Sequence, residues 1–372
     1  MARGNLILLL AVLLLSPPVL AHKPSDSYLT LDPAQGTGNW DIALRDLEHA
    51  IGLDTNQDGG LTWGEVKGHH QAIAAYALAR LTLTRNGMDC RLSAGPQQLV
   101  DHSDGTYTVL PLELDCPAPG LLTVDYRLFF DLDPFHRGLL AVRHDDGSDT
   151  AILSPDRPTL TLAAAPRPWT VVLAGYWREG IWHIWIGFDH ILFLVALLLP
   201  AVLWREGGRW RATEALCPAL KEVVAIVTAF TVAHSLTLTL AVTGWLNLPS
   251  RWVESAIALT VVLAALNNLY PLVRGRRWAI AFTLGLIHGF GFAGVLADLG
   301  LPSGDMALAL AGFNLGVESG QLVIVALFIP LAFALRKTWF YRRVVLGLGS
   351  FAVATVALVW LLERSLNLTL MP

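Results

Sequence analysis

Long apolar runs separated by short charged loops fill the second half of the chain, whereas the first half is more polar. From about residue 171 onward, six runs each reach the roughly 20 residues that a helix needs to cross about 30 Å of hydrocarbon. These runs cover residues 182–204, 219–243, 252–273, 278–299, 306–335 and 344–362. The pattern predicts an all-α membrane bundle of six transmembrane helices over residues 171–372.

The sequence pattern over residues 22–170 predicts a soluble α+β domain. The stretches SDSYLTLD (25–32) and NWDIALRD (39–46) alternate like short strands, and residues 62–82 have the composition of a helix. Over residues 83–165, short β-rich runs such as TYTVLPLEL and LLTVDYRLFF are separated by turn clusters. That spacing is typical of an antiparallel β-sandwich.

The first 21 residues have the order of a secretory signal peptide. Arg3 precedes the apolar run LILLLAVLLL, and Val19-Leu20-Ala21 forms a small-residue cleavage site. An uncleaved anchor helix is the alternative, but the run is short for a span. We expect the mature chain to begin at His22 outside the cytoplasm. His22 is then either an ordinary solvated first residue, the favoured reading, or a chelator of copper or nickel through its free amine and imidazole.

Loop charges predict the orientation of the six runs. Arginine and lysine gather after runs one, three and five, at Arg205, Arg209, Arg211, Arg274, Arg276, Arg277, Arg336, Lys337, Arg342 and Arg343. By the positive-inside rule these loops are cytoplasmic. The soluble domain and the C-terminus then lie on the periplasmic side of a bacterial inner membrane, in agreement with the signal peptide.

Composition supports a membrane protein. The chain is 54% hydrophobic and only 15% charged, with a mean hydropathy of +0.51. A net charge of −4 argues against a nucleic-acid partner. Cys90 and Cys116 lie in the exported part and are expected to form a disulfide, whereas Cys217 falls in a cytoplasmic loop and stays a thiol.

Residues 54–65 match the calcium-binding loop of an EF-hand at every diagnostic position. The expected oxygen ligands are Asp54, Asn56, Asp58, the carbonyl of Gly60, and Glu65. Gly59 permits the sharp turn at position six. Thr62 and Glu65 also form a helix capping box, a reading compatible with Ca²⁺. An unpaired loop outside the cytoplasm predicts a structural ion rather than a sensor.

Ionisable side chains inside the apolar runs are the main functional signal. They are His183, Asp189, His190, His234, Glu254, His288 and Glu318. Such groups cost at least a few kcal/mol each in lipid, and the same residue types ligate divalent transition metals. Amides that would add oxygen ligands are Asn267, Asn268, Asn314 and Gln321. The alternative is that these side chains serve only as hydrogen-bonding partners between helices.

The spacing of the first histidines restricts the geometry. His183 and His190 would lie about 10.5 Å apart on a straight helix, too far to chelate one ion. They indicate either two separate binding positions that an ion would occupy one after the other, or a helix that is unwound near Gly187. Asp189 points off that face, so its partner is expected on another helix. Glycine stripes at Gly312, Gly316 and Gly320, and at Gly285 and Gly289, predict close helix packing.

The segments His183-x5-Asp189-His190, AHKPSDSYL and LDTNQDGGLTWGEV resemble the HupE/UreJ family, in its branch with a large exported N-terminal domain. The resemblance implies a nickel (or cobalt) permease associated with hydrogenase and urease maturation, with His183, Asp189 and His190 handling metal. Short members carry HGxAHGxE on a later helix. This chain has HGFGFA at 288–293, and Glu318 is the candidate for the missing carboxylate.

Three functions are compatible with these patterns. The first is a secondary permease for Ni²⁺, Co²⁺ or Zn²⁺, which is favoured over an enzyme; the chain has no nucleotide-binding P-loop, so we do not expect it to hydrolyse ATP. The second is a membrane-embedded zinc hydrolase in which Ser235 or Ser319 touches substrate. The third is a non-catalytic sensor or assembly factor. A homo-oligomer or a metalloenzyme-maturation partner is compatible with each.

Overall fold

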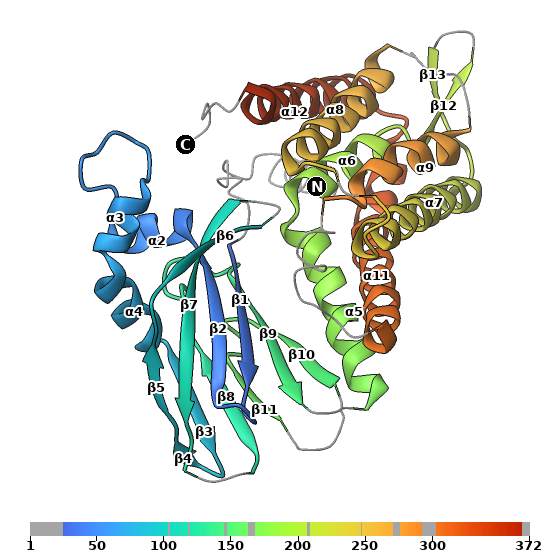
Figure 1. The fold of residues 1–372 in the computed structure, drawn as a ribbon. Helices are drawn as coiled ribbons and strands as arrows, with labels where there is room; N and C mark the ends of the chain where they lie inside the picture. Colours follow the sequence, from blue (N-terminus) through green and yellow to red (C-terminus); the bar gives the residue numbers. More distant parts are fainter. Residues whose placement is uncertain are drawn as a thin grey trace, which may run out of the picture. The chain divides into compact units, whose positions relative to one another are not determined.

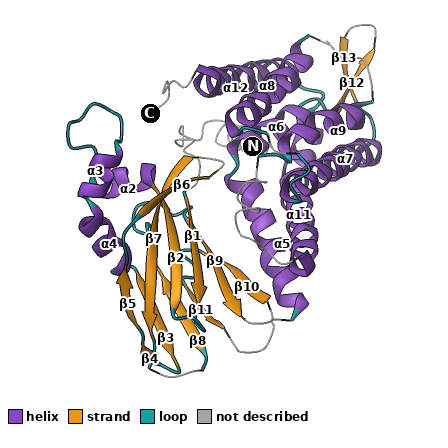
Figure 2. Cartoon of the chain, viewed as in Figure 1, coloured by secondary structure: helices purple, strands orange, loops and turns teal. Residues whose placement is uncertain are grey.

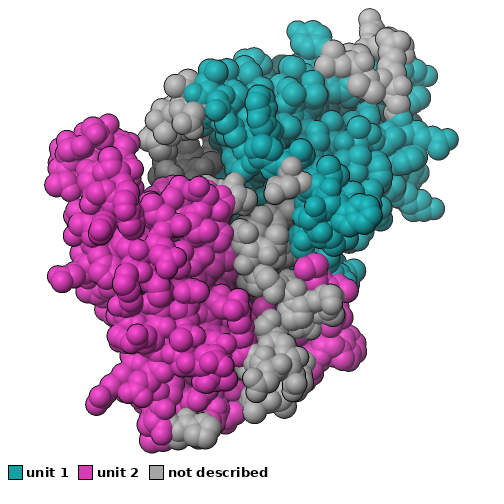
Figure 3. All heavy atoms as spheres, viewed as in Figure 1, with its two compact units in different colours: residues 1–22, 176–293, 309–372 teal, residues 23–175, 294–308 magenta. Residues whose placement is uncertain are grey.

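The computed structural model describes residues 25–102, 105–117, 120–144, 147–162, 168–206, 209–246, 248–270, 276–291 and 303–366. The chain forms two compact units (Figure 3). One comprises residues 23–175 with 294–308, and the other comprises residues 1–22, 176–293 and 309–372. The predicted signal peptide and His22 lie outside the described residues.

Two β-sheets form most of the first unit (Figure 1). The larger has the strand order β10-β9-β1-β2-β7-β5, with β6 also paired to β7. Its strands are β1 (Asp26–Asp32), β2 (Thr37–Ala43), β5 (Arg91–Ala94), β6 (Gln98–His102), β7 (Gly105–Asp115), β9 (Arg137–His144) and β10 (Gly147–Leu153). The smaller has the order β11-β8-β3-β4, from β3 (Leu81–Arg85), β4 (Met88–Asp89), β8 (Leu122–Tyr126) and β11 (Thr159–Leu162).

The predicted α+β domain is confirmed, but its larger sheet is not purely antiparallel. Strand β1 pairs in parallel with β9, with Tyr28 opposite Leu139, while the other strand pairs are antiparallel. Residues of both sheets, including Leu29, Trp40 and Val124, are buried in one common core. The two sheets therefore pack face to face, as a sandwich does.

Three helices complete this core beside β5: α2 (Leu44–Ile51), α3 (Trp63–Gly68) and α4 (His70–Leu78) (Figure 1). Two sequence predictions are corrected here. The strand expected over 39–46 ends at Ala43, and residues from Leu44 onward turn a helix that buries Leu44 and Leu47. The helix expected over 62–82 breaks after Gly68 and stops at Leu78, because Leu81 and Leu83 alternate inward as strand β3.

The predicted disulfide is present between Cys90 and Cys116. A second tie in this unit is a buried hydrogen-bond chain around His136. Its Nδ1 lies 2.6 Å from Ser25 Oγ and its Nε2 lies 2.6 Å from Tyr126 Oη. Burial lowers the pKa of His136 to about 3, so the imidazole is neutral in the folded domain.

The second unit is helical (Figure 2). Its helices are α5 (Trp169–Ile186) from residue 176 onward, α6 (Phe188–Leu198), α7 (Leu216–Val242), α8 (Ser250–Leu269), α9 (Arg277–His288), α11 (Ser303–Leu335) from residue 309 onward, the π-helix η1 (Tyr341–Leu348) and α12 (Gly349–Leu366). Within the described residues, four helical segments are long and apolar enough to cross a membrane. The bent pair α5–α6 makes a fifth if it is one span. The chain is thus a multi-pass membrane protein by its helices.

The described residues do not contain six continuous membrane spans. The first predicted span, 182–204, is bent by 73° between α5 and α6. It is followed by a hairpin of β12 (Leu203–Glu206) and β13 (Arg209–Ala212). Of the predicted span 278–299, the structure describes helix only as far as His288. The count of six remains a prediction.

Glycines set the close packing of the bundle, as the stripes predicted. A Cβ on Gly316 of α11 would lie 2.0 Å from the carbonyl oxygen of Trp177 in α5, and one on Gly180 of α5 would lie 2.0 Å from that of Phe313. Likewise a Cβ on Gly289 would lie 2.4 Å from the carbonyl oxygen of His234 in α7. Only glycine lets these backbones touch.

Candidate metal centre

The break between α5 and α6 creates the site. Gly187 sits at the break, where a Cβ would lie 2.7 Å from the His183 carbonyl oxygen and 3.0 Å from His190 Nδ1. The 73° bend brings the imidazole rings of His183 and His190 to a centroid distance of 4.7 Å. Of the two geometries that the sequence left open, the structure has the broken helix, which allows both histidines to reach one ion.

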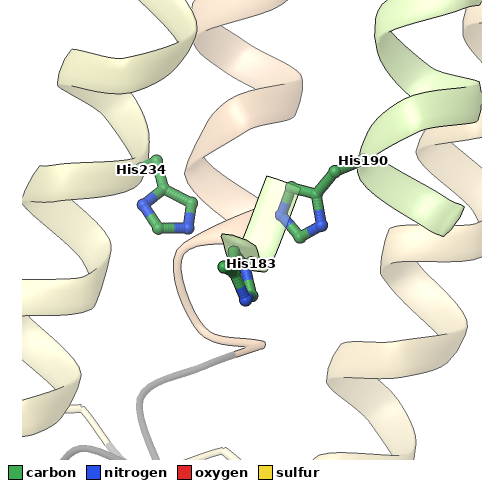
Figure 4. Close-up of side chains that lie close together, drawn as sticks. All are labelled: His183, His190 and His234. Atoms are coloured by element: carbon green, nitrogen blue, oxygen red, sulfur yellow. The ribbon is translucent and has the colours of Figure 1, made fainter. Parts of the chain in front are cut away.

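A third imidazole joins them from α7. One ring nitrogen from each of His183, His190 and His234 can be chosen so that all three lie within 4.8 Å of one another. Figure 4 shows the three rings facing a common space from different helical segments. Metal–nitrogen bonds are about 2.0–2.1 Å long, so small side-chain rotations suffice to close such a triad on one ion.

Acceptors behind the triad hold the rings in place. His190 Nδ1 lies 2.9 Å from Asp189 Oδ1, and that oxygen also accepts the His190 backbone N–H at 2.8 Å. His234 Nδ1 lies 3.2 Å from Asn314 Oδ1 on α11. Metal-binding histidines characteristically donate their second nitrogen to such a partner. The expectation that Asp189 pairs with another helix is wrong: its carboxylate turns back onto the next residue in the first turn of α6.

His288 lies beside the triad. Its ring centroid is 5.1 Å from that of His190, and its Nε2 lies 2.9 Å from Thr260 Oγ1 on α8. His234 and His288 are both fully buried. Among the described residues, the buried imidazole nitrogens without a hydrogen-bond partner include His190 Nε2, His234 Nε2 and His288 Nδ1. Buried polar atoms in native proteins are nearly always paired, so three such nitrogens close together make this cluster a candidate ligand site.

Aromatic rings enclose the histidines and keep the site apolar. Phe193 and Phe230 lie 4.7 and 5.3 Å from the ring of His288, and Phe313 lies 5.2 Å from that of His183. All three phenylalanines are buried. In such low-dielectric surroundings a cation interacts more strongly with its ligands than it would in water.

The remaining predicted ligands are held elsewhere. Glu318 accepts the Thr228 hydroxyl at 2.6 Å, and Gln321 Oε1 accepts that of Thr231 at 3.3 Å. These two pairs and His234–Asn314 form a polar stripe between α7 and α11. Glu254 accepts from Ser250 and pairs with Arg364 at 3.7 Å.

The amides on α8 also lie apart from the histidines by their contacts. Asn268 donates to the Ala196 carbonyl at 2.7 Å and to Ser350, which ties α8 to α6 and α12. Asn267 lies next to it near the end of α8. The sequence did not single out Thr260, because one threonine in the run SAIALTVVL has no distinguishing pattern. Only its hydrogen bond with His288 identifies Thr260 as part of the site.

The serines of the hydrolase hypothesis are engaged with their own helices. Ser235 Oγ donates to the Thr231 carbonyl at 2.7 Å, and Ser319 Oγ donates to the Leu315 carbonyl at 2.7 Å. Ser319 also accepts from the indole N–H of Trp177. Neither hydroxyl therefore has its proton on a neighbouring base.

The EF-hand-like loop is folded around its own side chains. Asp54 Oδ2 accepts the Gly59 N–H at 2.9 Å, and Asn56 Oδ1 accepts the Asp58 N–H at 2.9 Å. Asp58 Oδ1 accepts the Gly60 N–H, and the expected capping box of Thr62 and Glu65 begins α3. The backbone N–H and hydroxyl of Thr62 hold the pKa of Glu65 below its ordinary value.

Comparison with known proteins adds one match. A family model described as HupE / UreJ protein matches residues 159–364, which is more than half of the chain and includes all the histidines of the centre. The first 158 residues, with both β-sheets nearly complete, lie outside the match. No curated protein matches the chain.

Proposed function

The chain belongs to the HupE/UreJ family, and on that premise we propose that it is a permease for a divalent transition-metal ion, most plainly Ni²⁺. The family suggests a nickel- or cobalt-transporter-like membrane protein. The observation that carries the proposal is the convergence of His183, His190 and His234, with buried ring nitrogens lacking partners on two of them. Neutral imidazole suits Ni²⁺, Co²⁺ and Zn²⁺, whereas Mg²⁺ and Ca²⁺ prefer oxygen.

The polar stripe supports a route away from the centre. Span orientation proposed from the arginine-rich loops takes α7 toward the periplasm and α11 toward the cytoplasm. From His234–Asn314 the stripe then continues inward to the pairs Thr231–Gln321 and Thr228–Glu318, which share one stretch of the two helices because their order along α7 is the reverse of their order along α11. An ion that leaves the imidazoles meets amide, hydroxyl and carboxylate oxygens there. Each is a weaker ligand for Ni²⁺ than a histidine triad, as release requires.

A zinc hydrolase is the second candidate, because three converging imidazoles also match a catalytic zinc site with an open fourth position. Such an enzyme needs a general base or nucleophile at the metal. Asp189 is engaged by His190, and the Ser235 proton is on its own helix. These contacts favour transport.

Metal accumulation tests the proposal. Cells expressing wild type, His183→Ala, His234→Ala, Glu318→Gln or Ser235→Ala are exposed to Ni²⁺, Co²⁺, Zn²⁺, Cu²⁺ and Mn²⁺ in turn. We expect one metal to accumulate in wild type and to fall to the empty-vector level in both histidine variants at equal protein abundance. Glu318→Gln is expected to be slowed.

Ser235→Ala is the matched control, since it lies next to His234 and loses only a bond within α7. Permease activity should survive it. Equal accumulation in wild-type and empty-vector cells for every metal would refute the transport proposal, and an equal loss in Ser235→Ala would show that disturbed packing of α7, and not a lost ligand, explains the His234→Ala result.

For the exported domain we propose a structural Ca²⁺ in the loop 54–65, bound by Asp54, Asn56, Asp58, the Gly60 carbonyl and Glu65. The bond from the Gly59 N–H to Asp54 supports it, because it draws the loop into a ring around the first ligand. Calorimetric titration of the full chain with Ca²⁺ checks this. Binding heat that persists in Asp54→Ala would contradict it.

A further inference from the structure

Each histidine with an unpartnered nitrogen faces a group that can only accept, and this fixes which nitrogen carries the proton. Asn314 shows it for His234. Its amide nitrogen donates to the Leu310 carbonyl at 2.8 Å. With the amide so oriented, Oδ1 faces His234 Nδ1, so Nδ1 must be the donor. The lone pair of His234 is therefore on Nε2.

Thr260 fixes His288 in the opposite sense. Its single hydroxyl proton is directed to the Ile257 carbonyl at 2.6 Å. The threonine oxygen can then only accept from His288 Nε2, 2.9 Å away. The bare nitrogen of His288 is Nδ1, the atom that is buried without a partner. His190 follows the first pattern, with Asp189 accepting from Nδ1.

Three different acceptors thus have the same effect. Each one leaves a histidine of the buried cluster with one ring nitrogen that carries no proton. Leaving a buried nitrogen without a hydrogen bond is destabilising. Water or hydroxyl donors would satisfy one such atom, but a cluster of acceptors alone is what a cation requires. The Asp189–His190 contact is local to α6, but the other two join α7 to α11 and α9 to α8, so no local sequence effect explains their agreement.

We propose that Asn314 and Thr260 are positioning residues of the metal centre, which hold His234 and His288 as the tautomers that present a bare nitrogen to the ion. The inference rests on the proposed function and assigns two residues to it that touch no metal themselves. It makes His288, through Nδ1, a further imidazole donor beside His190, next to the triad whose nitrogens lie within 4.8 Å of one another.

The test uses the purified full-length chain in detergent, titrated with Co²⁺ as the probe while Ca²⁺ is in excess to occupy oxygen sites. The visible absorption of Co²⁺ reports nitrogen ligation. The variants are Asn314→Leu and Thr260→Val, which keep the side-chain size and remove the acceptor. Thr260→Ser keeps the hydroxyl. Thr237→Val is the matched control, a buried threonine bonded only to carbonyls of its own helix.

We expect Asn314→Leu and Thr260→Val each to weaken Co²⁺ binding by roughly 10–100-fold, the usual effect of removing a partner behind a metal-binding histidine. Thr260→Ser and Thr237→Val should bind as wild type does. Nitrogen-15 shifts of labelled histidine in the metal-free chain should show His234 protonated on Nδ1 and His288 on Nε2. In Thr260→Val, His288 should no longer be fixed as the Nε2-protonated tautomer, whereas His234 should remain protonated on Nδ1.

The possible failures are distinguishable. If wild type binds no Co²⁺, or if His234→Ala binds as tightly as wild type, the metal centre itself is refuted. If His234→Ala abolishes binding but Asn314→Leu and Thr260→Val leave it unchanged, the centre stands and the positioning role is overturned. Equal losses in Thr260→Val and Thr260→Ser would likewise overturn it for Thr260, since a packing defect and not the hydroxyl would be responsible.

Discussion

Gly316→Ala should abolish metal binding at the proposed centre without replacing any of its ligands. The new Cβ would lie 2.0 Å from the Trp177 carbonyl oxygen, whereas ordinary contact begins near 3.4 Å. Helices α5 and α11 would have to separate by roughly 1 Å, an overpacking that costs about 1–3 kcal/mol. The protein should survive this cost, but the geometry of the site should not.

Helix α5 is the element that must yield. Helix α11 is joined to α7 by the pairs Asn314–His234, Gln321–Thr231 and Glu318–Thr228. A shift of α5 carries His183 away from His234, while His190 stays on the far side of the break at Gly187. Metal–ligand distances tolerate only about 0.2 Å, so a displacement of roughly 1 Å dismantles the triad.

Co²⁺ titration and Ni²⁺ accumulation measure the effect, with Gly320→Ala as the matched control one turn along the same helix. There the new Cβ would lie 3.3 Å from Ile181 atoms, so a shift of a few tenths of an ångström accommodates it. We expect Gly316→Ala to behave like His183→Ala and Gly320→Ala to resemble wild type. Wild-type Co²⁺ affinity in Gly316→Ala would refute the reasoning.

Two further predictions concern the N-terminal domain. The folded pKa of His136 is about 3, against an ordinary value of 6.5, so the unfolded chain takes up its proton first as the pH falls. Hydrogen exchange of β1 amides in the full chain should show that the stability of the domain decreases by roughly 1.4 kcal/mol per pH unit from pH 6.5 toward pH 3. The decrease should be smaller in His136→Gln. Equal slopes in the two proteins would contradict the role of His136. Replacing Cys90 and Cys116, 26 residues apart, by alanine should lower the free energy of unfolding of the domain by about 3 kcal/mol in urea titrations, and an unchanged midpoint would contradict this.

The sequence predicted the chemistry of the centre better than its geometry. Ionisable residues in apolar runs are visible at a glance, and the histidines among them are the ones that the structure brings together. The break at Gly187 was only one of two options, because a glycine in an apolar run is equally compatible with close helix packing, as at Gly316. What decides is the crowding of a Cβ against His183 and His190, which depends on the fold.

Helix neighbours explain what the sequence could not specify. Glu318 was expected to face the ion, but its nearest donor is Thr228 of α7, a contact that follows from the register of two helices 90 residues apart. The parallel pairing of β1 with β9 is equally non-local. Short alternating runs predict strands but not their order, since either direction buries the same face.

The helix break also explains why an aspartate accompanies the histidines. The N-terminus of α6 begins at the break, and a helix N-terminus has a partial positive charge of roughly half a unit. This charge disfavours a cation beside His190. Asp189 stands in the first turn, accepts the His190 N–H and fixes the imidazole through the same oxygen. A cation centre built at a helix N-terminus needs a carboxylate there, both to offset the helix dipole and to orient the ligand.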